Sequence, residues 1–84
     1  MKVTVLLFAN ARELVDSSSV ELELPDAEAT SKSLTAALVS AYPALSDVMK
    51  TAMLAVNRKY VDKEEGIAVS AKDEIAVIPP VSGG

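Results

Sequence analysis

The chain has 84 residues, 50% of them hydrophobic and 24% charged, which is the composition of one small globular domain. It contains neither Cys nor His, and this excludes disulfides, thiol nucleophiles, imidazole bases and most transition-metal sites. The net charge of −4, with Lys and Arg scattered along the chain, argues against a nucleic-acid partner, since phosphate binding needs a basic surface.

The N-terminal segment, Lys2–Ala9, is rich in β-branched and large apolar residues and predicts a strand. Alternation places Val3, Val5 and Leu7 on one face and Leu6 and Phe8 on the other. The run is too short to cross a bilayer and lacks the cleavage pattern of a signal peptide. We therefore expect no membrane partner and a cytoplasmic location.

A hairpin partner for this strand follows after a short helical turn over Asn10–Val15 and a loop over Asp16–Ser19. In Val20–Leu24, apolar residues alternate strictly with two glutamates. This pattern is typical of an antiparallel strand with one buried and one exposed face. Pro25 and Asp26 end the strand.

The main helix is expected to begin after Thr30 or Ser31, either of which is a suitable N-cap. Apolar residues then recur at helical spacing, at Leu34, Ala37, Leu38 and Ala41. Because the residue before a proline avoids helical geometry, Pro43 should end this helix near Ala41. A second short helix is predicted over Ala44–Lys50.

The C-terminal half predicts strands at Met53–Val56, Tyr60–Val61 and Glu74–Ile78, with a turn at 57–59 and a charged loop at Asp62–Gly66. This element order indicates an α+β fold of the β-grasp, ubiquitin-like type. It would have a mixed sheet, one main helix on one face, and the last strand beside the first. We assign residues 1–78 to the domain and 79–84 to a flexible, extended Gly-Gly tail.

The tail itself carries the strongest functional signal. Its two prolines hold the backbone extended, and the glycines have no side chain, so it can thread into a narrow tunnel. The residues that we expect to insert are Pro79, Pro80, Val81, Ser82 and Gly83. The carboxylate of Gly84 is the reactive group: ATP-dependent activation gives an acyl-adenylate, from which a thioester or thiocarboxylate can form. A frayed tail without function is the alternative.

A docking surface is predicted on the sheet face that the helix leaves open. Several apolar residues alternate onto this face and form the expected partner interface: Leu6, Phe8, Tyr60, Ala76 and Ile78. The prediction requires the first and last strands to be neighbours. Coverage by loops or by the short second helix is the alternative.

The sequence resembles the small subunits of molybdopterin synthase over essentially its whole length. The matching segments are Val5–Ala9, Ala11–Leu14, Ala55–Asn57, Asp73–Ile78 and the ending Pro79–Gly84. The resemblance implies two partners: an E1-like adenylyltransferase with a sulfurtransferase, and a large synthase subunit in a heterotetramer. Gly84 would become 1-thioglycine through a transient acyl-adenylate and donate sulfur to cyclic pyranopterin monophosphate.

The resemblance also implies that catalytic side chains belong to the large subunit and that no cofactor or metal is permanently bound. Because the sequence already ends at Gly84, we expect that no maturation cleavage is needed. Two related alternatives stay open. Thiamin-type sulfur carriers share the fold and the Gly-Gly ending but typically lack the preceding Pro-Pro-Val-Ser. Ubiquitin-like modifiers would conjugate Gly84 to lysines of other proteins. A plain binding module is the third possibility.

Overall fold

The computed structural model describes residues 1–62 and 65–80. Its elements, in chain order, are β1 (Lys2–Leu7), α1 (Ala9–Val15), β2 (Ser19–Glu23), the 3-10 turn η1 (Asp26–Glu28), α2 (Ser31–Ala41), the 3-10 turn η2 (Pro43–Leu45), α3 (Ser46–Thr51), β3 (Met53–Val56), β4 (Lys59–Val61) and β5 (Ile75–Ile78). The described strands form one five-stranded sheet in the order β2-β1-β5-β3-β4.

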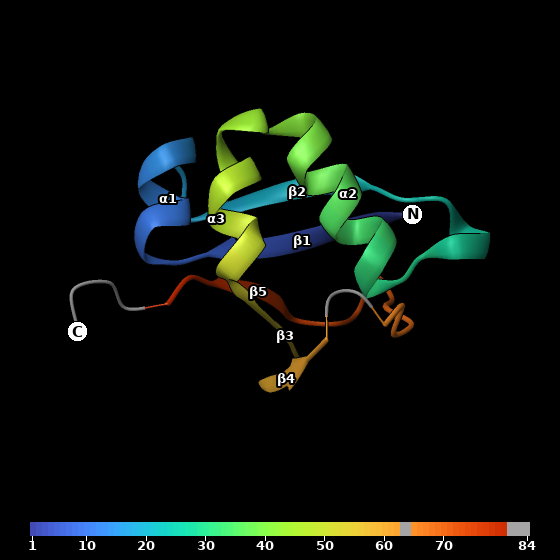
Figure 1. The fold of residues 1–84 in the computed structure, drawn as a ribbon. Helices are drawn as coiled ribbons and strands as arrows, with labels where there is room; N and C mark the ends of the chain where they lie inside the picture. The colour runs from blue at the N-terminus through green and yellow to red at the C-terminus, as the bar shows by residue number, and fades with distance from the viewer. Residues whose placement is uncertain (63–64, 81–84) are drawn as a thin grey trace.

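The sheet is mixed. β1 and β5 are parallel, while β1–β2, β3–β5 and β3–β4 pair antiparallel. The last strand therefore lies beside the first, in the centre of the sheet, as predicted. Figure 1 shows the three α-helices on one side of this sheet, which confirms the β-grasp arrangement.

The core lies between the helices and the sheet. Alternation along β1 buries Val3, Val5 and Leu7, and alternation along β5 buries Ile75 and Val77 on the same side. The largest fully buried side chains are Leu7, Leu34, Leu38, Leu45, Leu54 and Ile75. Burying each contributes about 1.5–3 kcal/mol relative to exposure. Because this face is committed to the core, the alternate residues of the same strands must face the other way.

The main helix, α2, begins with a capping box. Thr30 Oγ1 accepts a hydrogen bond from the Ser33 backbone N–H (3.1 Å), and Ser33 Oγ accepts one from the Thr30 N–H (2.9 Å). These bonds satisfy two groups that a helix start leaves unpaired. The helix ends at Ala41, two residues before Pro43, as expected. Ala41 is exposed, however, so the buried part of the predicted stripe stops one turn earlier.

Several boundaries differ from the predicted ones. α1 begins at Ala9, one residue before the predicted start, β2 is Ser19–Glu23 in place of Val20–Leu24, and β5 begins at Ile75 in place of Glu74. β1 ends at Leu7 instead of residue 9, because Phe8 is the N-cap of α1 and Ala9 already has a positive φ of 49°. The predicted turn at 57–59 is a two-residue turn, and Lys59 belongs to β4. The predicted second helix appears as η2 followed by α3.

Two predicted segments are not fully described. Within the charged loop Asp62–Gly66, residues 63 and 64 lie outside the described residues. In the tail, Pro79 and Pro80 have no helix or strand geometry, and residues 81–84 lie outside the described residues. None of the helices in the described ranges is long and apolar enough to span a membrane.

Candidate functional site: an apolar pocket on the open sheet face

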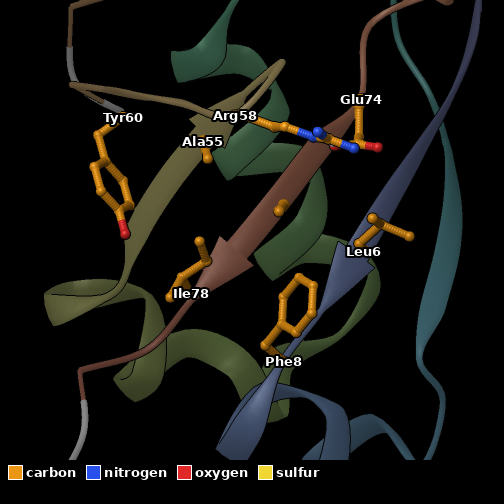
Figure 2. A pocket seen from close by; sticks show the side chains of 8 residues that line it. Leu6, Phe8, Ala55, Arg58, Tyr60, Glu74 and Ile78 are labelled. Carbon is orange, nitrogen blue, oxygen red and sulfur yellow. The ribbon is translucent and has the colours of Figure 1, made fainter.

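A shallow pocket of about 280 Å³ lies on the sheet face opposite the helices (Figure 2). Its floor follows one lateral row of the sheet, in which Leu6 is opposite Ala76, Ala76 is opposite Ala55, and Ala55 is opposite Tyr60. The two central residues are alanines with short side chains. Because their neighbours are larger, the middle of the face is hollow.

Larger apolar side chains lie at the two ends of this row and beside it. Leu6 lies on β1, Phe8 just after it, Tyr60 on β4 and Ile78 at the end of β5 (Figure 2). Phe8 is 45% exposed and Tyr60 64% exposed, although both are large and mostly apolar. Several exposed apolar side chains on adjacent strands are typical of a protein-binding surface.

All five residues predicted for the partner interface therefore line one pocket. The structure adds three more: Ala55, Arg58 and Glu74. Alternation could have found Glu74, which is two residues before Ala76, whereas Ala55 is identified by its pairing with Tyr60 on the neighbouring strand. No local pattern indicates Arg58, which reaches the pocket from a turn.

The pocket has one charged end and one apolar end. Arg58 and Glu74 form an ion pair at the start of β5, with Arg58 Nε 3.5 Å from Glu74 Oε1. Phe8 and Ile78 line the other end, where β5 finishes (Figure 2). Ile78 is four residue steps beyond Glu74, or roughly 13 Å along extended backbone.

The charged end is tied to the sheet by hydrogen bonds around Asn57. The Asn57 N–H donates to the Glu74 carbonyl (2.7 Å), and Asn57 Oδ1 accepts from the Glu74 N–H (2.9 Å). Asn57 Nδ2 donates to Asp73 Oδ1 (2.9 Å), and the Ser70 N–H donates to Asp73 Oδ2 (2.7 Å). The Asn57 amide and the Ser70 N–H together lower the pKa of the Asp73 carboxyl below its ordinary value. Asp73 therefore links the backbone at Ser70 to the turn at Asn57 through its carboxylate.

The apolar end is the root of the tail. Pro79 follows Ile78 directly and is buried, whereas Pro80 is exposed. The chain thus leaves the body beside Phe8 and Ile78. Gly84 and the predicted inserting residues Val81, Ser82 and Gly83 lie outside the described residues, so their predicted roles are untested.

The described residues offer a binding surface. In residues 1–62 and 65–80, no three His, Cys, Asp or Glu side chains are grouped so that they could hold a metal ion. The pocket is lined by apolar side chains and one ion pair. What this geometry can do is to dock a partner beside Pro79, where the tail begins.

A β-grasp body with an apolar pocket beside the root of a Gly-Gly tail defines a small carrier or modifier of the ubiquitin-like class. Comparison with known proteins narrows the class. Residues 5–84 match the ThiS family, and the chain belongs to that family.

Two relatives and one solved structure extend this result. A "molybdopterin synthase sulfur carrier subunit" from Chlamydomonas reinhardtii is 42% identical over 84 residues, which is all of both chains. The protein of the same name from Dictyostelium discoideum is 41% identical over 80 residues, 95% of this chain and 93% of that one. The crystal structure of SAMP1 from Haloferax volcanii superimposes with a TM-score of 0.85 at 34% identity, covering both chains completely.

Proposed function

We propose that this protein is a sulfur carrier and the small subunit of a molybdopterin synthase in molybdenum cofactor biosynthesis. The observation that carries the proposal is the full-length similarity to proteins of that name, at 41–42% identity. The Gly83-Gly84 ending supplies the chemistry, because it places a carboxylate without a neighbouring side chain on a narrow segment.

The chemistry proceeds at the Gly84 carboxylate. An E1-like enzyme joins the carboxylate to the α-phosphate of ATP, and pyrophosphate leaves. A persulfide on the sulfurtransferase then displaces AMP, and a thiol cleaves the S–S bond of the resulting acyl disulfide, so that Gly84 ends in a thiocarboxylate and the two thiols in a disulfide. This sulfur is transferred to cyclic pyranopterin monophosphate in the large subunit, in the cytoplasm, and contributes to the dithiolene. The side chains that catalyse the transfer belong to the large subunit, in keeping with the composition of this chain, which has no Cys or His.

The pocket on the open sheet face is the proposed docking surface for both partners. Docking there would fix the body beside the root of the tail, since Ile78, which lines the pocket together with Phe8, directly precedes Pro79. Pro79 and Pro80 restrict the backbone before binding, which lowers the entropy cost of ordering the inserted residues. The body thus supplies affinity while the tail delivers the reactive group.

A ubiquitin-like modifier is the second candidate, and one observation favours it. A second crystal structure, of a protein named H. volcanii small archaeal modifier protein 1, is also similar to this chain. It is 29% identical and covers 95% of this chain. In that case Gly84 would form an isopeptide with lysines of other proteins. A thiamin-type carrier is the third, and the Pro79–Ser82 segment argues against it.

Reconstitution distinguishes these functions. Thiocarboxylated protein, mixed with a molybdopterin synthase large subunit and cyclic pyranopterin monophosphate, should give molybdopterin without ATP, because activation has already occurred. A parallel reaction with thiazole synthase and its substrates tests the thiamin-type role. Protein isolated from its own cells should carry a thiocarboxylate; high-mass conjugates in its place, with no molybdopterin formed, would identify a modifier.

A further inference from the structure

Arg58 is the positively charged residue of an otherwise largely apolar pocket. Its side chain is 88% exposed, while that of its partner Glu74 is 50% exposed. The pair is held by one contact of 3.5 Å through Nε, which is long for a charge-assisted hydrogen bond. Exposed pairs of this kind add little to stability. Folding energetics therefore do not account for an arginine at this position.

The backbone nevertheless holds Arg58 in a defined place. Asn57 and Arg58 have φ values of 53° and 70°, and Val56 pairs with Lys59 across them. Positive φ at both central residues is the geometry of a type I′ hairpin turn. The three hydrogen bonds of Asn57 to residues 73 and 74 attach this turn to the start of β5. The arginine is thus positioned relative to the pocket before any partner binds.

The chemistry of the guanidinium indicates what it recognises. It has five N–H donors in a planar fork that matches a carboxylate, and its contact with Glu74 uses the Nε edge. Because the side chain is so exposed, most of these donors face solvent. When a partner covers the guanidinium, water is displaced from its N–H donors. A hydrogen bond from these donors to a carboxylate of the partner then becomes stronger. Figure 2 shows the guanidinium beside Glu74 at the charged end of the pocket.

We propose that Arg58 binds a carboxylate of the docking partner and so sets the orientation of the complex. This inference rests on the proposed function, in which the partner is the large synthase subunit. That subunit would present an apolar segment to Phe8 and Ile78 and an acidic side chain roughly 13 Å away, at the Arg58 end. An apolar contact alone would let the two proteins rotate relative to each other, whereas a charged contact at the opposite end of the pocket fixes their relative orientation.

The test compares Arg58→Gln, Arg58→Lys and Glu74→Gln with Lys59→Gln as the matched control. Lys59 is the next residue, is exposed, and does not line the pocket. Affinity for the large subunit is measured by calorimetry at low and high salt, and folding by thermal unfolding. Arg58→Gln should weaken binding about tenfold and reduce its salt dependence. Arg58→Lys should lie in between, and Lys59→Gln should stay within about twofold of wild type. Glu74→Gln should bind at least as tightly as wild type, because it removes a carboxylate that competes with the partner's carboxylate for the guanidinium.

Each outcome decides the inference. Equal affinities of Arg58→Gln and Lys59→Gln, with wild type binding normally, would overturn the role of Arg58 and leave the proposed function standing. Weakening by Glu74→Gln but not by Arg58→Gln would mean that the partner presents a cation, and would overturn it too. A wild-type protein that does not bind the large subunit would overturn both the proposed function and this inference.

Discussion

Replacement of Phe8 by alanine is the most direct probe of the pocket as a docking surface. A phenylalanine side chain presents roughly 200 Å², and 45% of Phe8 is exposed, so a partner can cover about 90 Å² of it. At about 25 cal/mol per Å², this area corresponds to about 2 kcal/mol of binding free energy. Phe8→Ala should therefore weaken binding to the large subunit about 30-fold.

The variant should still fold. The buried part of the ring contributes up to about 3 kcal/mol by the same conversion, and a domain of this length has roughly 4–13 kcal/mol of stability. Circular dichroism and urea unfolding would check that the β-grasp fold is retained. The dissociation constant is then measured by calorimetry with purified large subunit.

Leu14→Ala is the matched control. Leu14 is 48% exposed, close to the value for Phe8, but it lies on α1 and does not line the pocket. Its replacement should leave the dissociation constant within about twofold of wild type. The reasoning fails if folded Phe8→Ala binds within about threefold of wild type, or if Leu14→Ala weakens binding equally.

Three further predictions concern the tail, the core and the Asp73 carboxylate near the charged end of the pocket. Deletion of Gly84 should abolish sulfur transfer in the reconstituted synthase without changing the thermal midpoint; transfer by the shortened chain would exclude the carrier mechanism. Leu38→Ala should lower the free energy of unfolding in urea by about 3 kcal/mol, because Leu38 is fully buried; a loss below about 1 kcal/mol would contradict the packing. The pKa of Asp73 is lowered in the folded protein, so its contribution to stability is complete above the ordinary value of 3.8 and is lost as the pH falls through the folded value. Between about pH 6 and pH 3, wild type should consequently lose more stability than Asp73→Asn; parallel pH profiles would show that the hydrogen bonds to Asp73 do not stabilise the fold.

The order and type of the elements were predictable because they depend on local patterns. Strict alternation over Val20–Leu24 identified an antiparallel strand, and β2 has one buried and one exposed face as predicted. Thr30 and Pro43 bounded the main helix because capping and proline geometry act within a few residues. The reactive group, the Gly84 carboxylate, stays a prediction from the sequence, which has no Cys or His.

Only the tertiary structure decided how the pocket is built. Leu6, Ala55, Tyr60 and Ala76 form one row through the register of four strands, and such non-local pairing is not encoded in any short sequence pattern. Alternation could assign faces, but it could not show that two alanines lie together and hollow the surface. The position of Arg58 depends on a turn with two positive φ angles, attached to a strand that begins 17 residues further on. A local pattern specifies which face a side chain takes, whereas the pairing of distant strands specifies which side chains meet.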